Sequence, residues 1–251
     1  MKITLIRNAT LWLEYGGVKF LIDPMLSEPG VNPPIPNTEN DRRNPLVPLP
    51  PQWETLGQPD VVIVTHLHPD HWDPAAAQWL DKQLPVLCQP GNEDQIAADG
   101  FTQVTPIWVV GSVGEIEIIR TTGHHGTGEI GEQMGPVSGF VFQAPGEPVV
   151  YLAGDTIWCS EVAEALDKYH PEWTIVNAGG ARFTVGDPIT MTAQDVTTVA
   201  QYAPYTQVVA VHMEAINHCL LTRTELSEHI RNEGLSERVH IPVDGESLSD
   251  K

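Results

Sequence analysis

Short apolar runs, bounded by glycine, proline and polar clusters, recur along this chain and predict a strand-rich α/β fold. At the start, residues 3–6, 9–15 and 18–22 are predicted strands, with a tight turn at Gly16-Gly17 between the last two. No internal repeat and no linker is visible, so the chain is interpreted as one domain, residues 1–251. Further strands are predicted at residues 61–64, 85–89, 105–110, 115–120, 138–143, 149–153, 173–177, 207–211 and 238–243.

Capping residues mark the starts of several predicted helices. Asp73 suits an N-cap and Pro74 the first turn, while Thr192 and Thr222 each open a capping box with an acidic residue three positions later. Because the strands up to residue 153 mainly meander and the later ones alternate with helices, we predict two sheets with helices outside them. Helices are predicted from residue 74, at 93–99 and 160–169, and from residues 192 and 222.

Two long segments are predicted to be irregular. Residues 28–59 hold nine prolines and no periodic apolar pattern, and a loop of this length is usually a functional lid or disordered. We interpret this segment as a proline-rich active-site loop. It carries Arg42-Arg43, the one adjacent basic pair of the sequence, which could meet an anionic substrate or simply be solvated. Residues 123–139 are predicted to form a glycine-rich loop.

The acidic composition excludes some partners. The net charge is −20, from 33 acidic and 13 basic residues, and a field of that sign repels phosphate backbones. A nucleic-acid substrate is therefore not expected. Excess acid is typical of a soluble protein, and it also fits a protein adapted to high salt, where ions screen the charge.

Cysteine use and hydropathy indicate the compartment. Cys88, Cys159 and Cys219 are widely spaced and odd in number, which is typical of buried thiols in a reducing compartment. No segment approaches the roughly 18 apolar residues of a membrane span, and the N-terminus has no leader-like pattern. We expect a cytoplasmic protein without a membrane partner.

Three histidines and an aspartate occupy six positions directly after the predicted strand at residues 61–64. His66 and His68 lie two apart, so that both side chains leave an extended backbone on one face. Asp70 and His71 follow where the chain turns toward a helix, and can face a second, neighbouring metal. Four ligand-type side chains at this spacing predict a metal site, because a catalytic site needs several such groups to converge.

With this motif after a strand, the chain resembles the metallo-β-lactamase superfamily over nearly its whole length. The family pattern H-x-H-x-D-H is matched at residues 66–71. It is followed by a single histidine, an aspartate and a final histidine at strand ends, here His124, Asp155 and His212. The segments 7–10 (RNAT) and 21–24 (LIDP) look like the branch that contains ascorbate-phosphate lactonase and N-acyl-phosphatidylethanolamine phospholipase D.

The resemblance implies a four-layer αββα sandwich with two divalent metal ions in a cleft between the sheets. A mixed imidazole and carboxylate set suits zinc, with iron or manganese as alternatives. A hydroxide bridging the metals would attack a small ester, lactone or phosphoester, and Asp70 would aim it. The implied ligands are His66, His68 and His124 for the first metal, Asp70, His71 and His212 for the second, and Asp155 as the bridge.

Two of these ligand positions have a competing histidine. His125 follows His124, where the preceding glycine favours His124; His218 competes with His212, where the strand end favours His212. Asp23 is predicted to be structural or to orient a ligand imidazole.

Two functions other than catalysis compete with the hydrolase hypothesis. An inactive metal-binding sensor or scaffold of the same fold is one, although a vestigial site tends to lose ligands. A structural zinc site is the other, but such sites are closed and commonly rich in cysteine, whereas none of the seven candidate ligands is a cysteine. The sequence therefore predicts a metal-dependent hydrolase acting on a small molecule.

Overall fold

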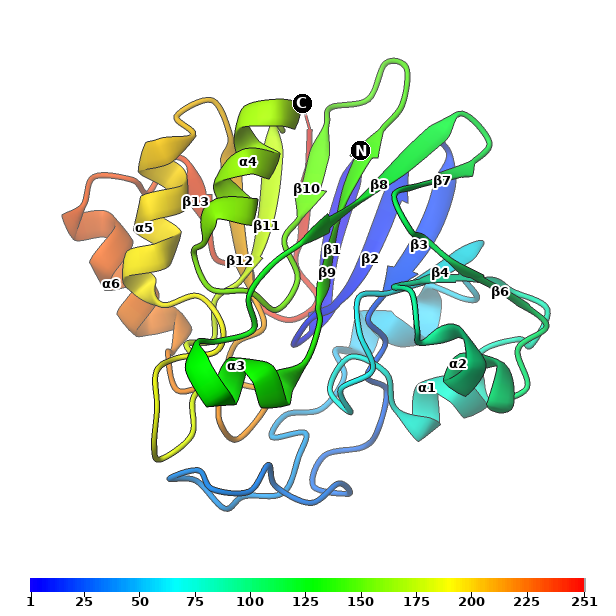
Figure 1. Ribbon diagram of the computed structural model, residues 1–251, viewed down its shortest axis with the longest axis horizontal. Helices are drawn as coiled ribbons and strands as arrows, with labels where there is room; N and C mark the ends of the chain where they lie inside the picture. The colour runs from blue at the N-terminus through cyan, green and yellow to red at the C-terminus, as the bar shows by residue number, and fades with distance from the viewer. Residues whose placement is uncertain (251) are drawn as a thin grey trace.

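Two seven-stranded sheets pack face to face in the computed structural model, which describes residues 1–250 (Figure 1). The first sheet consists, in spatial order, of β14 (Ser247–Ser249), β1 (Lys2–Arg7), β2 (Thr10–Tyr15), β3 (Val18–Ile22), β4 (Val61–Val64), β5 (Pro85–Cys88) and β6 (Gln103–Pro106). The second consists of β13 (Val239–His240), β12 (Gln207–Val211), β11 (Trp173–Asn177), β10 (Val150–Leu152), β9 (Ser138–Gln143), β8 (Ile116–Thr122) and β7 (Val110–Val113).

The two sheets share one topology. In the first, β1, β2 and β3 pair antiparallel and β3 to β6 pair parallel. In the second, β7 to β10 pair antiparallel and β10 to β13 pair parallel. The carboxyl ends of β1, β3 and β4 therefore lie at one edge of the first sheet, and those of β8, β10 and β12 at one edge of the second. Ligand sites in α/β sheets form outside such ends.

Apolar side chains from both sheets fill the space between them. Phe20 of the first sheet and Phe142 of the second pack edge to face, with ring centroids 5.6 Å apart. The outer face of the first sheet is covered by α1 (Pro74–Trp79) and α2 (Glu93–Ala98), and that of the second by α4 (Ser160–Tyr169), α5 (Ala193–Tyr202) and α6 (Arg223–Asn232) (Figure 1). The predicted four-layer α/β sandwich is confirmed.

Helix starts follow the capping residues. The side chain of Asp73 accepts a hydrogen bond from the backbone N–H of Ala76, 2.7 Å away, at the start of α1. Reciprocal capping boxes begin α5 at Thr192 and α6 at Thr222, as the sequence predicts. These caps satisfy backbone N–H groups that have no partner within the helix.

The predicted strand at residues 105–110 is wrong, because the chain passes from one sheet to the other within it. β6 ends at Pro106 in the first sheet, and β7 begins at Val110 in the second. Between them, Trp108 and Val109 are exposed, at 69% and 67%. An apolar run normally indicates one buried strand, whereas here it bridges the two sheets.

Three further elements were not predicted. Helix α3 (Gly128–Met134) lies within the segment expected to be a glycine-rich loop, and β14 pairs with β1 at the end of the chain. A 3-10 helix, η1 (Pro51–Thr55), lies within residues 28–59.

A buried arginine holds the base of the segment at residues 28–59. The guanidinium of Arg7 donates hydrogen bonds to the carbonyl oxygens of Met25, Ser27 and Val47, at 2.7, 3.0 and 3.0 Å. The Arg7 guanidinium therefore joins the chain just before this segment to the part of the segment that returns to the sandwich. Within residues 1–250, no helix has the length and apolar character needed to cross a membrane.

Candidate metal centre

Seven imidazole and carboxylate side chains converge where strands of both sheets end. From the first sheet they follow β4, and from the second they follow β8, β10 and β12. The members are His66, His68, Asp70, His71, His125, Asp155 and His212. Six of these seven are ligands that the resemblance implies, and the seventh, His125, is the alternative to the implied ligand His124.

Asp155 lies at the centre of the group. Its Oδ2 atom is 3.2 Å from Nε2 of His71, 3.4 Å from Nε2 of His125 and 3.9 Å from Nε2 of His66. Its Oδ1 atom is 3.5 Å from Nε2 of His212. A carboxylate surrounded by so many imidazole nitrogens could bind a metal ion together with them.

On either side of Asp155, the donor atoms fall into two sets. Those of His66, His68 and His125 lie within 4.8 Å of one another, and so do those of Asp70, His71 and His212. In the second set, Oδ2 of Asp70 is 3.1 Å from Nε2 of His212. Nitrogen and carboxylate donors at this density are suited to hold divalent metal ions.

The structure places His124 outside the cluster and its neighbour inside it. The side chain of His124 is 53% exposed, and its Nε2 atom lies 2.9 Å from Oε1 of Glu161. His125 is buried and faces Asp155. The oxygen Oγ1 of Thr156 accepts a hydrogen bond from the backbone N–H of His124, which fixes this turn of the chain. Of the two adjacent side chains, only that of His125 therefore enters the cluster.

The ionised carboxylates in the cluster favour a positive charge beside them. Burial alone would raise the pKa of Asp70 and Asp155, but contact with His71 and His212 outweighs it and holds both pKa values well below the usual range. Burial alone would lower the pKa of His71, but Asp155, Asp23 and Asp70 outweigh it and raise that pKa to about 10. In the metal-free protein a proton on His71 therefore supplies the positive charge that a metal ion would bring.

Contacts with residues outside the cluster fix the orientation of the donor side chains. Nδ1 of His125 donates to the carbonyl of Ile189 at 2.7 Å, which leaves Nε2 free to bind a metal. Nδ2 of Asn177 donates to Oδ1 of Asp155 at 2.6 Å. The Sγ atom of Cys219 lies 3.3 Å from Nδ1 of His212. The sequence pattern does not single out Ile189, Asn177 or Cys219 for these contacts.

Left-handed backbone conformations also gather at the centre. Asn8, Asp23 and His212 have φ values of 60°, 45° and 62°. Asn8 joins the two sheets there: its carbonyl accepts from the N–H of His212 at 2.8 Å, and its amide donates to the carbonyl of Asp70 at 3.1 Å. Strained residues of this kind persist where the surrounding structure fixes them, commonly at functional sites.

His218, the alternative to His212, is buried beside the cluster but is not in either donor set. Its ring lies against that of Phe183, with centroids 6.2 Å apart. Burial lowers its pKa to about 4, and its Nδ1 atom has no hydrogen-bond partner among the described residues.

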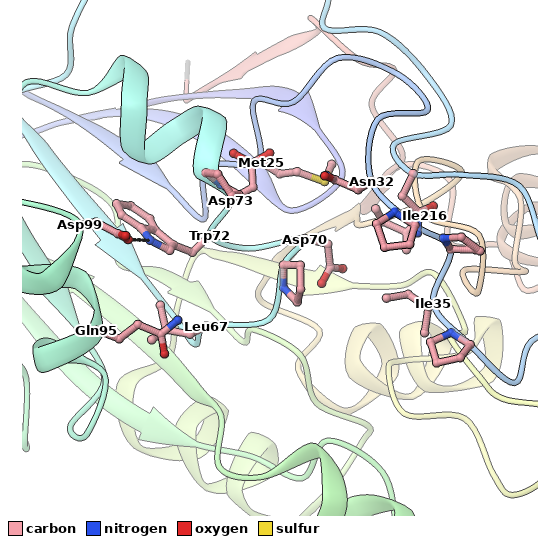
Figure 2. Close-up of a pocket in the computed structure, with 16 residues that line it drawn as sticks. Met25, Asn32, Ile35, Leu67, Asp70, Trp72, Asp73, Gln95, Asp99 and Ile216 are labelled. Carbon is pink, nitrogen blue, oxygen red and sulfur yellow. Dashed lines mark hydrogen bonds between the residues drawn. The ribbon is translucent and has the colours of Figure 1, made fainter.

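A cavity of about 530 Å³ opens beside Asp70. Figure 2 shows Asp70 between Trp72 on one side and Ile35 and Ile216 on the other. The lining is mostly apolar, and among residues 1–250 no arginine or lysine contributes to it. Besides Asp70, the lining holds two acidic residues, and both accept hydrogen bonds: Asp73 from the N–H of Ala76 in α1, and Asp99 from the indole N–H of Trp72.

The basic pair of the proline-rich loop does not line this cavity. Nε of Arg43 donates to the carbonyl of Gly30 at 2.7 Å, and both arginines are exposed. Arg43 therefore bonds within the loop, and neither arginine reaches the cavity.

The family model for the beta-lactamase superfamily domain matches residues 19–213. Protein YddR of Bacillus subtilis is 40% identical, over 99% of this chain and 100% of its own length. A relative from Rubrobacter xylanophilus, named a metal-dependent hydrolase, is 25% identical over 98% of this chain and 96% of its own.

A solved structure agrees with this assignment. The isothiocyanate hydrolase from Delia radicum gut bacteria is 37% identical and superimposes with a TM-score of 0.95, covering 100% of this chain and 99% of the other. These names agree with the predicted enzyme class. The chain belongs to the beta-lactamase superfamily domain family and has the metallo-β-lactamase fold.

Proposed function

We propose that this metal-dependent hydrolase holds two divalent cations and cleaves a small, neutral substrate that carries an apolar substituent. Zinc is the expected metal, with manganese or iron as alternatives. The donor atoms support one set of ligands for each cation and a shared carboxylate. The sets are His66, His68 and His125; Asp70, His71 and His212; and Asp155 between them.

Asp70 is the proposed catalytic residue. When bound, two cations would acidify a water molecule and stabilise negative charge on the substrate. Asp70 is the member of the cluster that also lines the cavity, so it touches both the metal donors and the space for substrate. Its carboxylate, held ionised by His71 and His212, can accept a hydrogen bond from the attacking water and take its proton.

The apolar lining of the cavity supports the proposal of a neutral substrate. An anionic phosphoester would enter a mostly apolar space to which the described part of the chain contributes no arginine or lysine, inside a protein of net charge −20. Burying an unpaired charge is costly, whereas a neutral ester, lactone or isothiocyanate carries none. The similar solved structure is named an isothiocyanate hydrolase. Addition of water to the central carbon of R–N=C=S and cleavage of its C–N bond would give R–NH₂ and O=C=S.

Matched substrates test this proposal. The purified protein is stripped with a chelator, reloaded with zinc, manganese or iron, and given benzyl isothiocyanate, benzyl acetate and a benzyl phosphodiester. We expect activity only after reloading, with kcat/KM at least about tenfold higher for a neutral substrate than for the phosphodiester. Preference for the phosphodiester, or full activity without metal, would contradict the proposal.

A conservative variant checks the role of Asp70. Replacing Asp70 with asparagine keeps the shape of the side chain but removes its ability to take a proton. We expect kcat to fall by about 10² or more, which is the usual contribution of a general base. Metal binding without turnover of any substrate by the unmodified protein would favour a metal-binding sensor instead.

A further inference from the structure

One fully buried side chain, that of Asn217, holds the proline-rich loop in place. Its Oδ1 atom accepts hydrogen bonds from the N–H of Ile35 at 2.9 Å and from Nδ2 of Asn44 at 2.8 Å. Its Nδ2 atom lies within 3.0, 2.8 and 2.6 Å of Ile35 O, Thr38 Oγ1 and Asn40 O. The backbone N–H of Asn217 in turn donates to Oδ1 of Asn44 at 2.9 Å. We call this set of contacts the Asn217 clasp.

The Asn217 clasp contacts the loop twice. Ile35 lies where the loop runs away from the sandwich, and Asn44 lies where the loop comes back to it. Few other bonds tie this part of the chain to the sandwich. The N–H of Leu46 donates to the carbonyl of Ala215, and the N–H of Thr184 donates to the carbonyl of Asn37. The loop segment pairs with neither sheet. Its position depends on the packing of Ile35 against the apolar cluster that contains Met25 and Ile216, and on polar contacts, among which those of Asn217 are the most numerous.

The loop residues held by the clasp form one wall of the substrate cavity. Residues 32–36 and Asn44 line it from the loop, and Ile216, the residue before Asn217, lines it on the same side of Asp70 as Ile35 (Figure 2). Asn217 itself does not line the cavity. It is therefore placed behind the wall, where it can fix the wall's distance from Asp70 without touching a substrate.

We propose that Asn217 is a positioning residue that sets the width of the apolar cavity and so selects the size of the substrate's substituent. The inference rests on the proposed function in taking this cavity as the substrate site. The metal donors stand outside the clasp, so loosening the loop should change which substituents bind without emptying the metal centre. Small misplacements of a binding wall lower the rate for substrates that depend on it.

Asn217→Ala tests the kinetic part. With a series of neutral substrates from a methyl to a benzyl substituent, we expect KM to rise about tenfold for the largest, which depend most on the wall. For the smallest, kcat should stay within about threefold of the unmodified protein. Bound metal, measured by atomic emission, should be unchanged.

Proteolysis tests the structural part without any substrate. Arg42 and Arg43 are exposed trypsin sites on the clasped loop. We expect Asn217→Ala to speed cleavage after these two residues at least about tenfold, because cleavage of a local segment follows how often it opens. Thr38→Val removes a clasp hydroxyl from the partly exposed loop side and should give a smaller effect of the same sign, which keeps the test valid if Asn217→Ala does not fold.

Asn40→Ala is the matched control. The side chain of Asn40 accepts only a local bond from the N–H of Arg42, and its contact with Asn217 is through the backbone carbonyl. It should leave cleavage and KM near their original values. Equal cleavage rates in all variants, or loss of metal in Asn217→Ala, would overturn the inference. Accelerated cleavage in a protein that hydrolyses none of the substrates would instead count against the proposed function alone.

Discussion

Nδ1 of His71 lies 2.8 Å from Oδ2 of Asp23, and both side chains are buried. Asp23 also accepts hydrogen bonds from the N–H and Oγ1 of Thr65, both at 2.7 Å, so its carboxylate cannot turn away. The carboxylate keeps a proton on Nδ1 of His71. The lone pair used for metal binding is therefore directed to Nε2, the atom that faces Asp155.

Asp23→Asn should weaken metal binding without unfolding the protein. Nδ2 of the new asparagine would face the protonated Nδ1 of His71 as a second donor, which favours the tautomer protonated on Nε2 and blocks the metal-binding atom. We expect metal affinity to fall by about 10- to 100-fold, measured by competition with a chromogenic chelator. Asparagine tolerates the left-handed φ of 45° at this position.

Asp60→Asn is the control for this substitution. The carboxylate of Asp60 accepts a backbone hydrogen bond from Lys19 at 2.8 Å, but on an exposed surface away from the metal donors. The Asp60→Asn protein should bind metal as tightly as the unmodified protein. An Asp23→Asn protein that binds metal as tightly as the original would show that Asp23 has only a structural role.

The adjacent histidines form a natural pair of test variants. His125→Ala removes a donor from the set with His66 and His68, so we expect loss of about one metal per chain and at least about a 100-fold drop in kcat/KM. His124→Ala removes only an exposed contact with Glu161 and should change kcat/KM by less than about twofold. Metal content by atomic emission and initial rates decide between the two. The reverse result would restore His124 as the ligand.

Most members of the cluster could be found from the sequence. His66 to His71 form a dense group of ligand-type side chains after an apolar strand, and Asp155 and His212 match the later positions of the pattern of the metallo-β-lactamase superfamily. The choice of His125 could not be made in this way, since which of two successive side chains turns inward depends on how the end of β8 is rotated. The contact between Thr156 and His124 that fixes it joins residues 32 positions apart.

The fold was predictable at the level of layers but not of sheet membership. The strands and capping boxes give local signals, whereas the crossing between the sheets at residues 107–109 has the same apolar character as a strand. Asn217 and Asn8 act through contacts with distant segments, as when Asn217 meets Asn44 from 173 positions away. A single polar residue carries no sequence pattern that would reveal such contacts.

Thr222→Ala should lower stability without affecting the site. The side chain of Thr222 accepts a hydrogen bond from the N–H of Glu225. This contact is part of the capping box that begins α6, on the outer face of the second sheet. Loss of an N-cap of this type costs about 1 kcal/mol. Urea unfolding should show a lower midpoint with an unchanged slope, and metal content should not change. An equal midpoint would mean that water replaces the cap at no cost.

The charge balance around His71 predicts that metal-free and metal-loaded protein respond differently to pH. Because the nearby carboxylates raise the pKa of His71 from 6.5 to about 10, its proton stabilises the metal-free fold fully below pH 6.5, and that contribution is lost as the pH rises through about 10. Thermal unfolding of metal-free protein should therefore occur at lower temperature at pH 9.5 than at pH 7, whereas metal bound at Nε2 removes the proton and this dependence with it. Zinc added at pH 8 in weak buffer should release that proton, seen with an indicator dye, and zinc affinity should rise by up to about tenfold per pH unit in this range. A metal-free protein with the same melting temperature at both pH values, and no proton release, would show that His71 is neutral before metal binds.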